Sequence, residues 1–110
     1  MNNKGYYRIT NGKKHMITDR EILGHSLYMS DKNITHLLIP DDMGIKHLYC
    51  SRNYLTKLVI PNGVEYLYCY GNPSLKELIL PDNVTYIMGD IGVLDITKYI
   101  QTKTHITLYA

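Results

Sequence analysis

The chain of 110 residues contains no phenylalanine and no tryptophan, and all 11 of its aromatic residues are tyrosine. The absence of the two apolar rings excludes a core built on large aromatic side chains. An amphipathic ring with a hydroxyl suits a surface that meets water or a partner. The composition therefore indicates an interaction surface, with compositional drift in an AT-rich genome as the alternative.

Concentrated charge and long apolar runs are also missing. The net charge is +2, with both signs scattered along the chain, which argues against an electrostatic DNA binder. No apolar run approaches the roughly 18 residues of a membrane span, and the first residues lack the apolar segment of a signal peptide. The only two cysteines, Cys50 and Cys69, occupy equivalent positions, so we expect buried, reduced thiols in a cytoplasmic protein.

The sequence does contain an internal repeat with a period of about 20 residues. One segment reads Leu-Tyr-Met at 27–29, Leu-Tyr-Cys at 48–50 and at 67–69, and Ile-Met-Gly at 87–89. A second reads Leu-Leu-Ile-Pro at 37–40, Leu-Val-Ile-Pro at 58–61 and Leu-Ile-Leu-Pro at 78–81. Self-similarity at this period predicts a solenoid, in which each coil stacks on its neighbours.

Alternation of period two within each segment predicts short strands whose every second side chain enters the core. The first inward seam begins at Leu27 and Met29, and a last copy is expected at Ile106 and Leu108. The second seam is expected to end, irregularly, with Leu94 and Ile96. Each coil thus has two strands. The prolines follow the second strand, at a position where a backbone N–H is not needed for pairing with the neighbouring strand.

Residues 1–23 do not share the repeat. Asn11-Gly12 between two alternating runs predicts a β-hairpin, because a type I′ turn needs positive φ at both central residues. Thr18 with Glu21 forms a capping-box pattern and predicts a short helix that ends near Gly24. We expect these residues to cap the open end of a solenoid that spans residues 24–110.

Residues 24–96 resemble leucine-rich repeats of the short, roughly 20-residue bacterial type, including the BspA-like class. The motif L-x-x-L-x-L-x-x-N is matched by the segments that end at Asn53 and Asn72, whereas Lys32 and Gly92 replace the asparagine elsewhere. The resemblance implies a mostly β solenoid with a curved parallel sheet. Asparagine amides at such turns can satisfy buried backbone groups of adjacent coils, and in the family they form a ladder.

If the seam residues point inward, their neighbours point outward onto one face. With parallel strands about 4.8 Å apart, Tyr28, Tyr49, Tyr68 and Met88 are expected in one column, and Tyr66 and Tyr86 in a second. Such an aromatic patch is typical of a binding site, although ring stacking alone would also stabilise the sheet. The predicted partner-binding residues are Tyr28, His47, Tyr49, Ser51, Tyr66, Tyr68, Tyr70, Tyr86, Met88 and Asp90.

Three aliphatic residues, Leu38, Val59 and Ile79, fall at the outward position of the second strand. Either another chain covers them in a self-association surface, or they are partly buried within the monomer. The sequence leaves both interpretations open.

The sequence carries no pattern that predicts catalysis, a metal or a cofactor. The five histidines are dispersed, and alternation places His47 and Cys50 on opposite faces, whereas a zinc site needs convergent ligands. The cysteines have no neighbouring base that would activate a nucleophile. Asp41, Asp42 and Asp82 are expected to form turns after proline.

These features predict a non-enzymatic protein-interaction module that occludes or organises a protein partner through its tyrosine face. Its small size and single-module organisation suggest an inhibitor or regulator. The more specific hypothesis is a phage anti-defence protein that acts on a host or defence enzyme. One alternative is a self-assembling structural protein. The other is a single-stranded nucleic-acid binder that stacks bases on the tyrosines, aided by Lys46 and Arg52.

Overall fold

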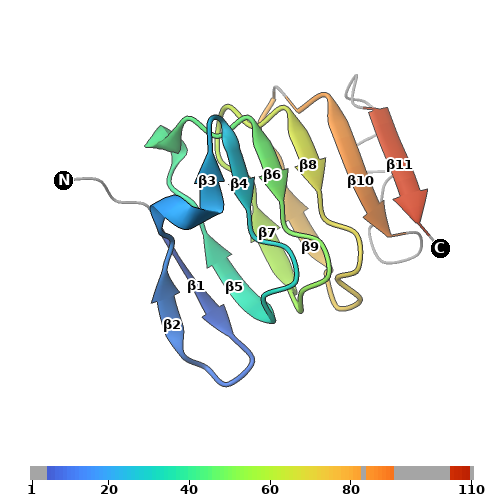
Figure 1. Cartoon of the computed structure of the whole chain (residues 1–110). Helices are drawn as coiled ribbons and strands as arrows, with labels where there is room; N and C mark the ends of the chain where they lie inside the picture. The colour runs from blue at the N-terminus through green and yellow to red at the C-terminus, as the bar shows by residue number, and fades with distance from the viewer. Residues whose placement is uncertain (1–4, 83, 91–104, 110) are drawn as a thin grey trace.

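The computed structural model describes residues 5–82, 84–90 and 105–109, which are mostly β and form about three turns of a solenoid-like arrangement (Figure 1). These residues contain no α-helix, only two 3-10 turns. The elements in chain order are β1 (Tyr6–Ile9), β2 (Lys14–Met16), η1 (Asp19–Glu21), β3 (Ile22–Leu23), β4 (Ser26–Tyr28), β5 (Ile34–Leu38), η2 (Asp41–Met43), β6 (His47–Tyr49), β7 (Lys57–Val59), β8 (Tyr66–Tyr68), β9 (Glu77–Ile79), β10 (Tyr86–Asp90) and β11 (His105–Tyr109).

The first strands of successive coils build one sheet in the order β11-β10-β8-β6-β4-β3. Its pairs from β4 to β11 are parallel and in register, so that Leu27, Leu48 and Leu67 are direct neighbours and Ile87 follows. The expected last copy is present as β11, whose backbone pairs in parallel with β10. The repeat period therefore sets the strand register, as the sequence predicts.

A second layer contains the other strand of each coil and lies behind the first sheet (Figure 1). In it β7 pairs with β9 in parallel, whereas β5 pairs with β1 in an antiparallel arrangement. Both layers turn their seam residues into one aliphatic core, where Leu27, Leu48, Leu58 and Leu67 have no exposed surface. The expected seam residues Leu94 and Ile96 lie outside the described residues.

The N-terminal hairpin predicted around Asn11-Gly12 is confirmed, because β1 and β2 pair in an antiparallel arrangement across it. The expected type I′ turn is wrong: Gly12 has a φ of 84°, but Asn11 does not have positive φ. The Gly12 N–H donates to the Ile9 carbonyl at 2.8 Å, so the turn is centred on Thr10 and Asn11, and Gly12 is the left-handed residue that follows it.

The capping box is also present: the Glu21 carboxylate accepts from the Thr18 backbone N–H at 3.1 Å. The expected short helix is only a single 3-10 turn. Ile22 already has an extended backbone and pairs with Leu27. Because Ile22 and Leu23 form strand β3, the helix cannot continue past Glu21.

Two buried asparagine side chains join neighbouring coils. The Asn53 amide nitrogen donates to the carbonyls of Met29 at 2.8 Å and Cys50 at 3.1 Å, and its oxygen accepts from the backbone N–H groups of Lys32 and Ile34. Asn72 repeats the arrangement one coil later, with donation to Cys50 and acceptance from Leu55, and its side chain is fully buried. The predicted bridging role of these asparagines is confirmed.

We predict that Asn53→Ala lowers the free energy of unfolding by about 3 kcal/mol, because buried carbonyls and N–H groups of two coils lose their partner. Urea denaturation followed by circular dichroism measures the change. The matched control is Asn62→Ala, since Asn62 is exposed and its side-chain amide donates to the exposed Asp41 carboxylate. Equal midpoints for the two variants would contradict the bridging role.

Candidate functional site

The outward face of the first sheet carries two continuous columns of side chains, which we call the tyrosine face. Strand register places Tyr28 beside Tyr49, Tyr49 beside Tyr68, and Tyr68 beside Met88. The second column is made by the residues that begin β4, β6, β8 and β10, together with Leu23 at the end of β3: Leu23, Ser26, His47, Tyr66 and Tyr86. Both predicted columns are therefore present on one side of the molecule.

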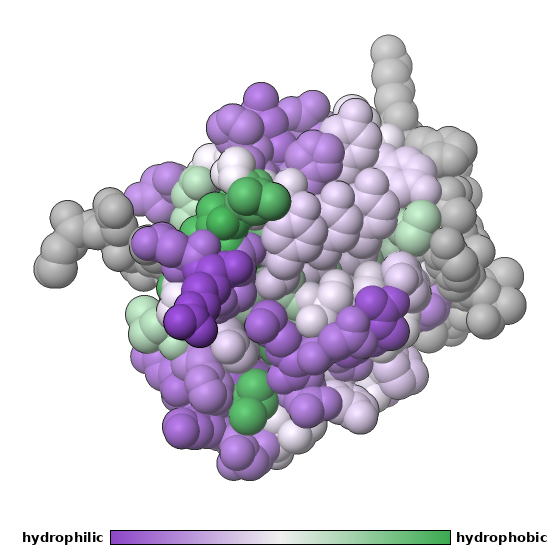
Figure 2. Space-filling model, viewed as in Figure 1, coloured by the Kyte–Doolittle hydropathy of each residue, from purple (hydrophilic) through white to green (hydrophobic). Residues whose placement is uncertain are grey.

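The rings of the first column are stacked flat against each other. The centroids of Tyr28 and Tyr49 lie 4.8 Å apart at 8°, and those of Tyr49 and Tyr68 lie 4.6 Å apart at 0°. His47 and Tyr66 stack in the same way at 4.6 Å. Figure 2 shows rings side by side in a pale area over β4, β6 and β8. Because the ring faces cover one another, the face presents ring edges and hydroxyls to the outside.

The stack closes at Tyr86, whose ring is tilted by 51° to Tyr68 and by 43° to Tyr66. Burial raises the pKa of the Tyr68 hydroxyl, and the nearby hydroxyls of Tyr49, Tyr86 and Tyr66 raise it further. These four tyrosines therefore lie close together on one region of the face. The strand register thus holds four hydroxyl groups near one another.

Ser51 does not face outward as predicted: it is only 2% exposed. Alternation stops there, because Arg52 adopts a left-handed conformation with φ of 55° directly after it. The Ser51 backbone N–H donates to the Ser30 hydroxyl at 3.0 Å, and this hydrogen bond links the coil of Ser51 to the preceding coil. Ser51 is therefore part of the turn and not of the tyrosine face.

Asp90 and Tyr70, two other predicted contact residues, take part in bonds between coils. The Asp90 carboxylate accepts from the backbone N–H groups of Gly71 at 2.7 Å and Asn72 at 3.0 Å. The Tyr70 hydroxyl accepts from the Arg52 guanidinium, which also makes a bidentate ion pair with Asp31. The Arg52 hydrogen bond holds the pKa of Asp31 below its usual range. These residues form a polar edge beside the tyrosines.

Leu23 belongs to the tyrosine face although the sequence repeat does not contain it. It pairs with Ser26 across the short antiparallel strand β3 and is 72% exposed. The described residues of the two columns include no Asp, Glu, Lys or Arg. The face is thus aromatic and apolar in the middle, as the cores of protein interfaces are.

The aliphatic column Leu38, Val59 and Ile79 lies on the opposite side of the core from the tyrosine face. Its residues are 50%, 47% and 44% exposed, so roughly half of each remains accessible in the monomer. Their neighbours Leu37, Leu58 and Leu78 are buried in the core. The interpretation of partial burial within the monomer is therefore confirmed, whereas the self-association surface stays a prediction.

The two cysteines lie in the core, and the pKa of each thiol is raised. Cys50 and Cys69 are free thiols with 0% and 1% exposure. Burial raises the pKa of Cys50 well above its ordinary value, and burial together with the Asp90 charge raises the pKa of Cys69 to about 12. In the part of the chain that the structure describes, no three His, Cys, Asp or Glu side chains gather as they would around a metal ion.

Comparisons with protein families, with curated proteins and with solved structures found no match to this chain. None of the described residues forms a helix of the length and apolar character that crossing a membrane requires. Function is therefore inferred from the geometry of the two faces.

We predict that the protein loses stability in alkali through its buried thiols. Because the pKa of Cys69 is raised from 9.0 to about 12 on folding, its contribution is complete below about pH 9 and is lost as the pH rises toward 12. Between about pH 9 and pH 10.5 the free energy of unfolding should fall by about 2 kcal/mol for this thiol alone.

Urea denaturation under reducing conditions at these two pH values measures the loss. Cys69→Ala should be less stable at neutral pH but should show a smaller alkaline decrease. An identical decrease in the variant and in the unchanged protein would show that the thiol does not cause it.

Proposed function

We propose that this protein is a non-catalytic binding module, which docks a partner protein on the tyrosine face and regulates that partner by occlusion. The observation that carries the proposal is the in-register stack of Tyr28, Tyr49 and Tyr68. Tyr28 is exposed and Tyr49 and Tyr68 are half-buried. Aligned tyrosines beside Leu23 and Met88 match the composition of interface cores, in which tyrosine and methionine are enriched and charge is depleted.

The stack supports binding because it is ordered before the partner arrives. Tyr49 is sandwiched between Tyr28 and Tyr68 at ring distances of 4.8 and 4.6 Å, so its rotamer is already fixed. Immobilising a free side chain at an interface costs roughly 0.5–1.5 kcal/mol, and a preformed stack avoids most of that cost. The neighbouring hydroxyls then add hydrogen bonds that fix the orientation of the partner.

The same stack counts against the nucleic-acid alternative. Base stacking needs free ring faces, but the faces of Tyr49 are covered on both sides by neighbouring tyrosines. Arg52, which the sequence offered as a phosphate contact, is held in its ion pair with Asp31 at 2.7 Å. Salt-dependent binding of single-stranded DNA or RNA in a gel shift would reverse this preference.

We further propose that the solenoid is of the leucine-rich-repeat type and that the hairpin of residues 1–23 caps it. The buried amides of Asn53 and Asn72, each bonded to the carbonyl of Cys50, support the repeat type. Support for the cap comes from β1, which pairs with the first-coil strand β5 and so occupies its outer edge. A capping element of this kind is needed wherever a solenoid ends.

We predict that the double variant Tyr49→Phe/Tyr68→Phe binds the partner at least tenfold more weakly, because two interfacial hydrogen bonds are each worth about 1 kcal/mol. The partner is first captured from extract of the native cell and identified by mass spectrometry. Its affinity for each variant is then measured by calorimetry. Phenylalanine keeps the ring stack, so the fold is preserved, whereas alanine would remove stacking partners on both sides of Tyr49.

The matched control is Tyr54→Phe, which removes the same atom from an exposed tyrosine outside the two columns. Its affinity should equal that of the unchanged protein. Equal affinities for the control and the double variant would show that the tyrosine hydroxyls are not the contact.

A further inference from the structure

Three residues of the tyrosine face form an unbroken stack of phenol rings across three coils. The ring centroid of Tyr49 lies 4.8 Å from that of Tyr28 and 4.6 Å from that of Tyr68, and the ring planes differ by 8° and 0°. Parallel pairing in register places the three residues side by side on β4, β6 and β8. Because the rings are parallel and aligned, the ortho carbons beside each hydroxyl lie in the layer next to those of the neighbouring ring. Phenoxyl radicals form carbon–carbon bonds at these ortho carbons.

The other contacts between tyrosines of this face are looser. The ring of Tyr86 lies 5.8 Å from that of Tyr68 at 51° and 6.4 Å from that of Tyr66 at 43°. Reactions between two groups of one chain depend on how closely the structure holds the reacting atoms. The flat stack around Tyr49 is therefore the favoured place for a bond between two phenol rings.

The composition directs a one-electron oxidation of this chain toward tyrosine. The sequence contains no tryptophan, which is the other side-chain ring that loses one electron readily. The thiols of Cys50 and Cys69 are 0% and 1% exposed, and thiol oxidation requires an accessible thiolate. Tyr28, at one end of the stack, is 43% exposed, so an oxidant can reach the stack from solvent. A tyrosyl radical formed there is already in contact with a second phenol ring.

We propose that the stack of Tyr28, Tyr49 and Tyr68 is a site of oxidative coupling, at which Tyr49 is joined to one of its two neighbours as dityrosine. The co-reactant is a one-electron oxidant of the class that a haem peroxidase forms from hydrogen peroxide. Each ring gives up one electron and its phenolic proton. The two phenoxyl radicals then form one bond between ortho carbons, and the protons on those carbons move to the two oxygens and restore both phenols. In total two electrons and two protons reduce one hydrogen peroxide to two water molecules.

The product is a covalent link between neighbouring coils. Tyr49 and Tyr68 are one repeat of about 20 residues apart, so the bond closes a loop of that length and restricts the unfolded chain as a disulfide does. Two groups held together on one chain have an effective concentration of roughly millimolar or more. Coupling in dilute protein should therefore occur within one chain and should stabilise the fold.

Oxidation of the full chain at about 5 µM by a haem peroxidase and hydrogen peroxide tests the site, because this concentration is far below the effective one. The product should be monomeric, two hydrogen atoms lighter, and fluorescent as dityrosine is. Trypsin places Tyr28, Tyr49 and Tyr68 on the separate peptides 21–32, 47–52 and 58–76. Mass spectrometry should find peptide 47–52 linked to one of the other two, and fragmentation should assign the bond. The urea midpoint of the product should exceed that of the untreated protein.

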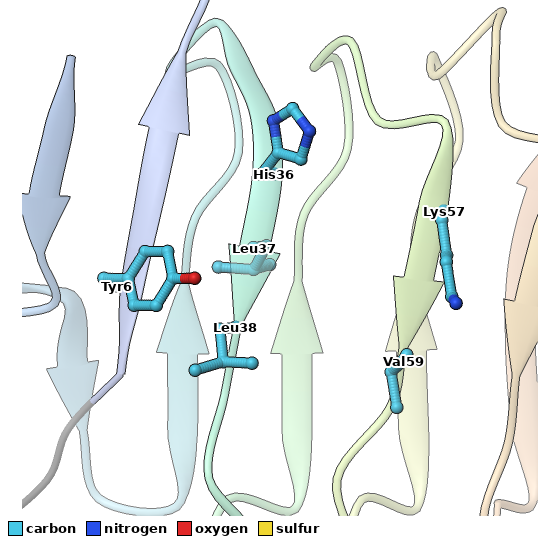
Figure 3. A pocket seen from close by; sticks show the side chains of 6 residues that line it. All are labelled: Tyr6, His36, Leu37, Leu38, Lys57 and Val59. Atoms are coloured by element: carbon cyan, nitrogen blue, oxygen red, sulfur yellow. The ribbon is translucent and has the colours of Figure 1, made fainter. Parts of the chain in front are cut away.

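Tyr49→Phe should lower the total dityrosine fluorescence at least about threefold, because it keeps the ring stack but removes the central phenol. The matched control is Tyr6→Phe. Tyr6 is half-buried like Tyr49, but it lines a groove in the second layer with Leu38 and Val59 (Figure 3). Among the described residues that line this groove Tyr6 is the only tyrosine, so the control should give the yield of the unchanged protein. Circular dichroism should show the same fold for both variants.

Any one of three results would overturn the proposal. The first is the absence of dityrosine within the chain at about 5 µM, whether the chain gains oxygen atoms instead or is linked only to other chains. The second is a bond between peptides 58–76 and 77–98 in place of one to peptide 47–52, which would place the coupling at Tyr86. The third is equal fluorescence from Tyr49→Phe and Tyr6→Phe. Docking of a partner requires no oxidation, so the two proposals fail separately.

Discussion

Hydrogen bonding that holds successive coils in one register is the constraint on which the rest of the structure depends. A slip of one residue would turn every inward side chain of a strand to the outside. Asn53 and Asn72 oppose such a slip, because each amide nitrogen donates to a carbonyl of its own coil and to one of the preceding coil. Each amide oxygen accepts from backbone N–H groups of the preceding coil. The register then aligns Leu27, Leu48 and Leu67 inside. Core and surface are therefore set by one interaction.

The same register explains why tyrosine replaces other aromatic residues on this chain. Parallel strands hold equivalent side chains at a spacing close to the stacking distance of rings, so each tyrosine is packed by the next coil without entering the core. Among the described residues, the buried core is made of aliphatic side chains, Met29 and the small thiols of Cys50 and Cys69. A ring with a hydroxyl satisfies both the stack and the solvent, whereas phenylalanine would leave a larger apolar patch exposed.

Features encoded within one repeat could be predicted from the sequence, and features that arise between distant segments could not. The seams, the existence of the hairpin at Asn11-Gly12 and the bridging asparagines follow from local spacing, whereas the type of the hairpin turn does not. The alternation predicts Ser51 on the outside, which is wrong because the left-handed backbone of Arg52 ends the alternation. The positions of Leu23 beside Ser26 and of Tyr6 beside Leu38 depend on antiparallel pairing between segments that share no repeat. A repeat period gives no information on such pairing.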